Sequence, residues 1–498
     1  MERSFGILMP IFSLPSKYGI GDFGKESYKF VDFLQKSGVR VWQILPLVQT
    51  GYGNSPYSSV SSTSFNPYFI SPELLKEQGL ITASELKFAL SEGKYIDYGA
   101  LYAVRYPLLR KAFSRFDKTD KNFLRYLSTK ESLSYALFMS IKYASGQKSF
   151  YEWDEALKRR EQKSLNKFYK DYKDEVLFWQ FVQYMAKRQW QALKKYANSK
   201  NVLIMGDMPL YVALDSVDVW TYPELFKLDD DFRPTKVAGV PPDYFCEDGQ
   251  LWGNPVYNYD VHKLDNFSWW AKRVESALKL YDFVRIDHFR ALDRYYEIDA
   301  DKPNAKVGEW VKVPSDELFN SIHAKVDKSR IIAEDLGIID DGVRELLKKN
   351  GYPGMKILSF AFNGDENNLY LPERIENNYI CYTGTHDNDT LLGLIENSSA
   401  WDYENLVRGV KNSLIKMQID ASVEDNDSLI KAIIELGFKS QASLYIMPYQ
   451  DVLNKGSDFR INEPGSIKEQ NWAVKFNKSD FSEKISKALK ALCVKYNR

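Results

Sequence analysis

The sequence predicts an α/β protein built on a (β/α)8 TIM barrel, and three observations support this fold class. Eight short apolar runs are bounded by turn residues, helical patterns separate most of them, and acidic residues follow several of the runs. Alternation of strands with helices is typical of a parallel sheet. Eight such units are expected to close into a barrel, whose active site lies at the carboxyl ends of the strands.

The expected strands are short, as strands in globular proteins usually are. They are residues 5–9, 39–47, 202–208, 283–286, 331–334, 355–362, 379–382 and 444–447. Amphipathic helical patterns between them cover residues 26–36, 269–280, 316–326, 341–349 and 403–418. The segment Gly19–Gly24 fits G-x-G-x-x-G, but it lies about ten residues beyond the first strand rather than directly after it. We therefore interpret it as a tight turn before a helix.

Two stretches are too long to be single crossovers, so we expect insertions into a barrel that occupies residues 1–498. Residues 71–198 carry helical patterns and are expected to form a mainly helical subdomain, with helices at 101–116, 133–143, 151–170 and 175–197. Residues 213–265 are rich in Pro, Gly, Asp and aromatic residues, which favours a loop-rich insertion over the active site. We expect no separate C-terminal β-domain.

Composition narrows the class of ligand. The chain has 67 basic and 67 acidic residues, so no general electrostatic attraction to nucleic acid or to an anionic membrane is expected. Aromatic residues make up 15% of the chain. This content suits a ligand with flat apolar faces, such as a sugar ring, although an aromatic-rich core would explain it equally well.

The cysteines and the apolar runs indicate the compartment. Cys246, Cys381 and Cys493 are an odd number without a C-x-x-C pair, which favours neither a disulfide framework nor a zinc cluster. The apolar N-terminal run is interrupted by Pro10, and no run approaches the roughly 20 residues of a membrane span. We expect a cytoplasmic protein without membrane association, and the sequence leaves open whether it is a monomer or a homo-oligomer.

Acidic residues follow four of the expected strands. The four segments are Gly206-Asp207-Met208-Pro209, Arg285-Ile286-Asp287-His288, Ala333-Glu334-Asp335-Leu336-Gly337 and Thr385-His386-Asp387-Asn388-Asp389. Since the strands of a barrel end at one mouth, these side chains are expected to converge. Any single one could be a structural carboxylate, but four at one mouth indicate a shared chemical purpose.

Converging carboxylates suit either a divalent metal site or glycosidic-bond chemistry. A metal is disfavoured because Arg285 would place a positive charge beside the ligands, and the acidic residues lack the spacing of a calcium loop. The four histidines are too few and too separated for a typical zinc site, so His288 and His386 are expected to bind or orient hydroxyl groups. We expect neither a metal nor another cofactor.

Glycosidic-bond chemistry needs one ionised carboxylate as the nucleophile and one protonated carboxyl as the acid. Arg285 and Asp287 are two residues apart on a strand, so their side chains share a face and Arg285 would help to keep Asp287 ionised. Glu334 follows an apolar run and is the better candidate for the proton donor.

Short motifs along nearly the whole chain form a recognisable set. They are Ser13-Leu14-Pro15-Ser16, Gly19-Ile20-Gly21-Asp22, Trp42 to Leu47, Ser55-Pro56-Tyr57-Ser58, Gly206 to Pro209, Gly239 to Phe245, Trp252-Gly253-Asn254-Pro255, Arg285 to Phe289, Ala333 to Gly337 and Gly384 to Thr390. Together, and in this order, they resemble the 4-α-glucanotransferases (amylomaltases or disproportionating enzymes, glycoside hydrolase family 77). Two departures are Leu394, where the family often has tryptophan, and Asn471-Trp472, which is not followed by a pattern ending in arginine.

The resemblance implies roles for individual residues. Asp287 would be the nucleophile, Glu334 the general acid/base and Asp387 the stabiliser of the transition state. Sugar contacts would come from Tyr57, Asp207, Tyr244, Phe245, Trp252, Asn254, Arg285, His288, His386 and Asn462, with a second glucan contact at Tyr52.

The same resemblance implies a reaction, namely the transfer of α-1,4-glucan segments between maltooligosaccharides by a retaining double displacement. Such a mechanism places the Asp287 and Glu334 carboxyls about 5 to 5.5 Å apart. A lid containing Tyr244, Phe245 and Trp252 would favour transfer by excluding water. The main alternative is an α-glucan hydrolase of the α-amylase superfamily, and a second is a non-catalytic glucan-binding protein.

Overall fold

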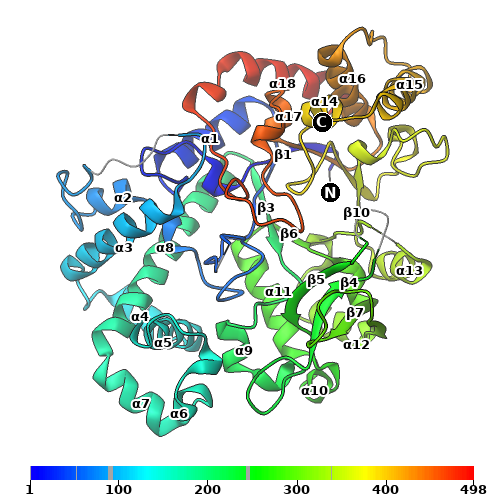
Figure 1. The fold of residues 1–498 in the computed structure, drawn as a ribbon. Coiled ribbons are helices and arrows are strands. Elements are labelled where there is room, and N and C mark those ends of the chain that lie inside the picture. The colour runs from blue at the N-terminus through cyan, green and yellow to red at the C-terminus, as the bar shows by residue number, and fades with distance from the viewer. Residues whose placement is uncertain (1, 52, 88–92, 243–246, 338) are drawn as a thin grey trace.

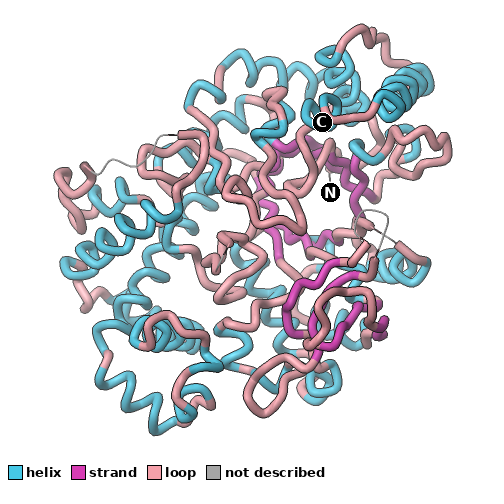
Figure 2. The backbone as a smooth tube through the Cα atoms, viewed as in Figure 1, coloured by secondary structure: helices cyan, strands magenta, loops and turns pink. Residues whose placement is uncertain are grey.

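A computed structural model describes residues 2–51, 53–87, 93–242, 247–337 and 339–498 of the chain. A ring of strands lies near the centre, with helices around it (Figures 1 and 2). No helix within the described ranges is long and apolar enough to cross a bilayer.

The central sheet has eight strands, and every neighbouring pair in it is parallel. Its strands are β1 (Ser4–Leu8), β2 (Val41–Gln43), β3 (Leu203–Met208), β6 (Phe283–Ile286), β9 (Ile331–Ala333), β10 (Gly354–Ile357), β11 (Tyr379–Tyr382) and β12 (Leu444–Pro448). β12 pairs with β1. The Ala333 N–H donates to the Pro353 carbonyl oxygen at 3.0 Å, which brings β9 beside β10. The predicted barrel is therefore confirmed, with all eight expected strands in place.

Helices follow most strands of the barrel. They are α1 (Lys25–Lys36), α11 (Ser268–Leu280), α12 (Ser315–His323), α13 (Asp341–Asn350), α14 (Leu391–Glu396), α15 (Ala400–Lys416), α16 (Asn426–Lys439), α17 (Tyr449–Val452) and α18 (Glu483–Tyr496). The strand expected over 355–362 was too long, because the backbone turns into a 3-10 helix at 358–360. Leu358 and Ala361 are buried although they lie at this turn. The apolar run over 355–362 therefore indicated burial and not the length of the strand.

A layer of helices lies between β2 and β3 in the sequence. It contains α2 (Pro72–Glu77), α3 (Tyr98–Arg115), α4 (Lys121–Leu127), α5 (Lys130–Ala144), α6 (Glu155–Lys158), α7 (Gln162–Asp171) and α8 (Lys173–Ser199). Helix α8 contacts α3, α4, α5 and α7 of this layer as well as α1 and β3 of the barrel, so it joins the layer to the barrel. The single helix expected over 151–170 was wrong, because Arg160 has a left-handed backbone and separates α6 from α7.

A second sheet, beside the barrel, is antiparallel and was not expected from the sequence. Its order is β5 (Gln250–Pro255), β4 (Lys236–Val240), β7 (Arg294–Asp299) and β8 (Glu309–Lys312). The stretch 213–265, expected to be loop-rich, thus supplies two strands as well as α9 (Val217–Thr221) and α10 (Tyr259–Leu264). Both strands are short and partly exposed, and β4 pairs with β7, which lies beyond β6 in the sequence, so no local pattern indicates that pairing.

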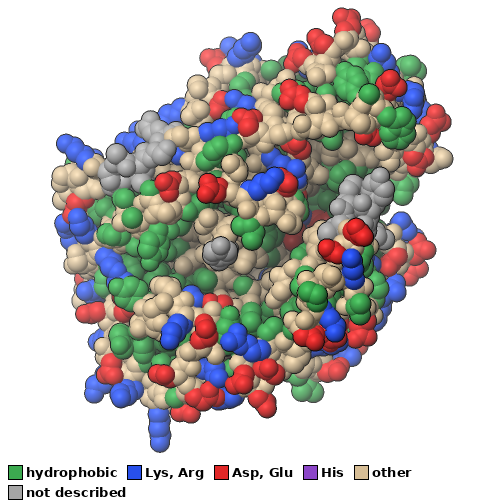
Figure 3. All heavy atoms as spheres, viewed as in Figure 1, with side chains coloured by type: hydrophobic (Ala, Val, Ile, Leu, Met, Phe, Trp, Pro, Cys, Tyr) green, Lys and Arg blue, Asp and Glu red, His purple; other side chains and the backbone are tan. Residues whose placement is uncertain are grey.

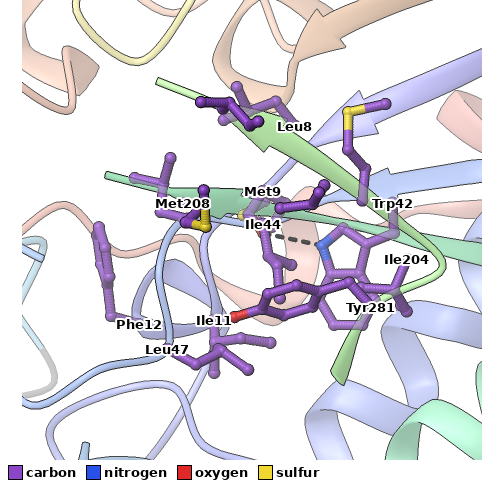
Figure 4. Packing of buried hydrophobic residues seen from close by; sticks show 14 of the residues in the cluster. Leu8, Met9, Ile11, Phe12, Trp42, Ile44, Leu47, Ile204, Met208 and Tyr281 are labelled. Carbon is purple, nitrogen blue, oxygen red and sulfur yellow. Dashed lines mark hydrogen bonds between the residues drawn. The ribbon is translucent and has the colours of Figure 1, made fainter. Parts of the chain in front are cut away.

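The barrel core packs tightly at β2 and β3. The Trp42 indole N–H donates to the Met9 carbonyl oxygen at 2.8 Å, and apolar side chains from neighbouring strands surround this bond (Figure 4). Tyr281, two residues before the first residue of β6, is also buried in this cluster. Its ring covers Gly206, where an added Cβ would lie only 2.1 to 2.3 Å from ring atoms. Glycine is therefore required at this position of β3.

Substituting Gly206→Ala should destabilise the protein by about 1–3 kcal/mol, because the tyrosine ring or the strand must move to admit a methyl group. A fall in the thermal unfolding temperature measures the effect. Gly99→Ala is the matched control, since its added Cβ would lie 3.4 Å from the nearest atom, a side-chain oxygen of Asp97. Equal unfolding temperatures for the two variants would contradict this account of the packing.

His262 on α10 is fully buried among aromatic rings, with Tyr257 and Trp269 centroids at 5.7 and 5.9 Å. Burial lowers the pKa of His262 to about 4, and Asp265 and the Leu225 backbone oppose this only in part. The folded protein therefore holds a neutral imidazole, while the unfolded chain takes up a proton below about pH 6.5. Stability must fall as the pH drops from about 6.5 towards 4.

Replacing His262→Phe should remove up to about 3 kcal/mol of this acid destabilisation, because no group remains to be protonated. Thermal unfolding at pH 8 and at pH 4.5 measures it, and the drop between the two should be smaller in the variant. His323→Phe serves as the comparison, because His323 is only partly buried. An identical pH dependence of wild type and His262→Phe would contradict the prediction.

Candidate active site

The acidic strand ends meet at one end of the barrel. Asp207 in β3 lies opposite Arg285 in β6, and Arg285 lies opposite Ile332 in β9, two residues before Glu334. The molecular surface is hollowed beside the second sheet on the face shown in Figure 3. The register of three neighbouring strands therefore brings these charged side chains together, as the sequence predicts for a barrel mouth.

A buried network of charges forms the floor of the site. Nη1 of Arg285 lies 2.8 Å from both carboxylate oxygens of Asp207 and 2.9 Å from Oδ1 of Asp287. The Tyr57 hydroxyl donates to Oδ2 of Asp207 at 2.5 Å. Arg285 is 3% exposed and Asp207 is 0% exposed, whereas 26% of the Asp287 side chain is open to solvent. Of these three charged groups, Asp287 is therefore the most open to solvent.

The protonation of Asp287 depends on two opposed effects. Burial raises the pKa of Asp287 well above its usual value, and Arg285 lowers it. Arg285 therefore acts in the expected direction, but it is shared with Asp207, and Asp207 itself adds repulsion that raises the pKa of Asp287. The sequence showed the neighbouring cation but not the burial that outweighs it.

Glu334 is held by backbone groups rather than by a cation. Its Oε2 accepts from the His288 N–H at 2.7 Å and its Oε1 from the Leu336 N–H at 2.9 Å. Burial raises the pKa of Glu334, with Arg285 and the two N–H groups opposing. A carboxyl of this kind can hold a proton at higher pH than an exposed one, which suits the general acid expected from the sequence.

His288 takes a left-handed backbone conformation, with φ of 49°. This uncommon conformation for a non-glycine residue turns the chain after β6 and aims the His288 N–H at Glu334. The Trp252 ring meets the imidazole edge to face at a centroid distance of 4.8 Å. Burial and the charge of Arg290 lower the pKa of His288 to about 3, so its imidazole is neutral.

Asp387 is oriented by residues from a distant part of the chain. The side-chain amide of Asn462 donates to Oδ1 of Asp387 at 2.6 Å, and Arg460 donates to its main-chain oxygen at 2.7 Å. Nε2 of His386 lies 3.4 Å from Oδ2 of the same carboxylate. Burial lowers the pKa of His386, while Asp387 opposes this.

The remaining predicted contacts are placed differently. Trp252 on β5 is 37% exposed and lies beside His288, whereas the Asn254 amide donates to the Val212 carbonyl oxygen at 2.9 Å and ties β5 to the segment after β3. Tyr52, Tyr244 and Phe245 lie outside the described residues. In the described ranges, no group of three or more His, Cys, Asp or Glu side chains is arranged to hold a metal ion.

Sequence reasoning missed two residues that support the site. Arg460 bonds Asp387 and the Asn462 carbonyl oxygen, and Trp472 packs on Tyr57. Both lie in a long irregular segment without strand or helix periodicity. In this segment the family resemblance named only Asn462 as a sugar contact, and Asn471-Trp472 stood out as a departure from the family pattern.

Comparison with known proteins agrees with this geometry. A profile of the 4-alpha-glucanotransferase family matches residues 9–480. The chain belongs to this family. A 4-alpha-glucanotransferase of Clostridium butyricum is 40% identical over 98% of this chain and 100% of its own length. Another, of Thermus thermophilus, is 40% identical over 99% of this chain and 98% of its own.

A solved structure supports the same conclusion. Amylomaltase from Streptococcus agalactiae, in complex with acarbose, matches with a TM-score of 0.94 at 38% identity, and the match covers 100% of both chains. The expected glycosyl-transferring enzyme is therefore confirmed, and 4-alpha-glucanotransferase is supported over the hydrolase alternative.

Substituting Arg285→Lys tests the electrostatics of the network. The lysine side chain is shorter and more flexible, so its ammonium should lie less firmly against the two aspartates than the buried Nη1 of Arg285 does, and burial should raise the pKa of Asp287 further. A carboxylate nucleophile loses its charge as the pH falls through its pKa, so the acidic limb of the kcat/KM profile should move to higher pH.

The pH profile of disproportionation measures this shift, and kcat/KM at neutral pH should fall at least about tenfold. Arg110→Lys, which alters an arginine paired with Glu175 in the helical layer, should leave the profile unchanged. An acidic limb at the wild-type position in Arg285→Lys would refute the electrostatic role.

Proposed function

We propose that the chain transfers α-1,4-glucan segments between maltooligosaccharides through a covalent glycosyl-enzyme, with retention at the anomeric carbon. One observation carries this proposal. The carboxyls of Asp287 and Glu334 follow hydrogen-bonded neighbouring strands, and of these two only Asp287 is contacted by the Arg285 guanidinium, whereas Glu334 accepts from two backbone N–H groups. Two such carboxyls in different surroundings are the requirement of a retaining glycosidase-type mechanism.

In the first half of the reaction, Glu334 gives its proton to the bridging oxygen while Asp287 attacks the anomeric carbon. The glycosidic bond breaks, the shortened glucan leaves with the proton, and the donor segment stays on Asp287 as an ester. In the second half, Glu334 removes the proton from the 4-hydroxyl of an acceptor glucan. That oxygen attacks the anomeric carbon and displaces Asp287.

Asp387 would stabilise the transition state by accepting hydrogen bonds from ring hydroxyls, and Asn462 fixes its orientation for this role. The neutral imidazoles of His288 and His386 can each donate and accept, so both suit hydroxyl groups of an uncharged sugar. Tyr57, Asp207, Arg285 and Trp252 would complete the contacts around the reacting ring. Tyr52, Tyr244, Phe245 and Asn254 stay predictions of the sequence for sugar binding.

Transfer requires that an acceptor sugar outcompete water for the glycosyl-enzyme. The exposed indole of Trp252, next to His288, offers a flat surface on which an acceptor ring can stack. Such stacking would hold the acceptor hydroxyl over the intermediate and exclude water there.

Replacing Asp287→Asn should lower disproportionation of maltotriose by more than about a thousandfold, since an amide cannot form the ester. Chromatography of the products measures it. The wild type should produce glucose together with chains longer than maltotriose, whereas a hydrolase would yield only shorter products. Asp301→Asn, at an exposed position paired with Lys302, should be fully active. Undiminished transfer by Asp287→Asn would overturn the proposed role of Asp287.

A further inference from the structure

Trp472 lies behind two proposed sugar contacts and touches both. The rings of Tyr57 and His386 stack at a centroid distance of 5.1 Å and an angle of 11°. The Trp472 ring packs against this pair, with centroid distances of 5.6 Å to Tyr57 and 5.8 Å to His386. Trp472 is only 5% exposed. The three side chains form one cluster, which we name the Tyr57 cluster.

Trp472 is held in a strained backbone conformation. Its φ is 63°, a left-handed value that costs an aromatic residue about 1–2 kcal/mol. Bonds on both sides fix it there, because its N–H donates to the Ile461 carbonyl oxygen at 2.8 Å and its own carbonyl oxygen accepts from the Tyr98 hydroxyl at 2.7 Å. Strain of this kind persists only where the surrounding structure determines it, and it is concentrated at functional sites.

The bond from Tyr98 belongs to a larger junction between the helical layer and the C-terminal segment. Residues 94–98 lead into α3, and residues 472–475 run beside them. The Ile96 N–H donates to the Ala473 carbonyl oxygen at 2.8 Å, and the Lys475 N–H donates to the Lys94 carbonyl oxygen at 2.8 Å. Lys94 also forms an ion pair with Asp458. The position of the Trp472 ring is therefore set from outside the barrel.

The Tyr57 cluster connects this junction to the charged floor of the site. The hydroxyl of Tyr57 can donate to Asp207 only while its ring stays in place, and His386 presents its Nε2 next to Asp387. A ring contact contributes about 0.5–1.5 kcal/mol beyond the area it buries, so two contacts from one indole are enough to bias both side chains.

We propose that Trp472 is a positioning residue of the transferase, which holds Tyr57 and His386 against the reacting sugar, and that residues 94–98 hold Trp472. The proposal rests on the proposed function for the sugar-binding roles of Tyr57 and His386. It assigns the helical layer a part in the reaction, because Tyr98 on α3 acts on the site through Trp472.

Kinetics of maltotriose disproportionation test the proposal. Trp472→Ala should lower kcat/KM by about 10- to 100-fold, whereas Trp472→Phe, which keeps a ring, should stay within about threefold of wild type. Tyr98→Phe removes only the bond to the Trp472 carbonyl oxygen and should lower kcat/KM by a smaller factor. Tyr102→Phe is its matched control on the same helix, and it should be silent.

A double-mutant cycle separates positioning from a general loss of stability. If Trp472 acts through Tyr57, then Trp472→Ala should cost much less in the Tyr57→Phe background than in the wild type. Titration of active sites by the burst of released glucan corrects each rate for unfolded protein. Wild-type kcat/KM per active site in Trp472→Ala would overturn the proposal. So would a double variant whose loss of kcat/KM equals the product of the losses in the two single variants.

Failure of the positioning role and failure of the proposed function give different results. If Trp472→Ala does not fold, Tyr98→Phe is the deciding variant, and wild-type kcat/KM in Tyr98→Phe would refute the link to the helical layer. An active Asp287→Asn would overturn the proposed function, whereas an inactive Asp287→Asn beside a fully active Trp472→Ala would overturn only the positioning role.

Discussion

The rest of the site depends on the buried ion pairs of Arg285. Its guanidinium is shared by two carboxylates, and only Asp287 keeps part of its surface open. A charge removed from water is costly unless it is paired, so removing Arg285 would leave both carboxylates without their cation. The pairing of β3 with β6 makes this arrangement possible, because their register places Asp207 opposite Arg285. The register of the barrel strands therefore also sets the electrostatics of the active site.

Around this charged floor, the histidines at the site are neutral. Burial lowers the pKa of both His288 and His386. A neutral imidazole offers one donor and one acceptor, as a sugar hydroxyl does, whereas an imidazolium would offer only donors. The site therefore separates its tasks. In the proposed mechanism, carboxylates and one arginine carry the charge for bond cleavage, and neutral polar groups face the uncharged sugar.

Three parts of the molecule beside the barrel strands support the active site. The second sheet brings Trp252 to His288, the C-terminal segment brings Asn462 to Asp387, and α3 holds the carbonyl oxygen of Trp472. Trp252 lies on the second sheet and the Trp472 carbonyl oxygen is bound by Tyr98 of α3, so two of these groups are held by elements outside the barrel. Such support from rigid surroundings is what a site needs in order to hold reacting groups within a fraction of an ångström.

The sequence by itself determined the barrel and the acidic strand ends, because an apolar run, a helical period and a carboxylate two residues beyond Arg285 are all local patterns. Together with the motif resemblance, it also named Asn462 and His386. Only the tertiary structure decided three features: the antiparallel second sheet, the hydrogen bonds that hold the Trp472 backbone, and the opposing effects of burial and Arg285 on the pKa of Asp287. Tyr98 and Trp472 are 374 residues apart, and the strand partners β4 and β7 lie on either side of β6 in the sequence. Contacts at such separations, and the burial that raises the pKa of Asp287, arise only when the whole chain has packed, so no short stretch of sequence can report them.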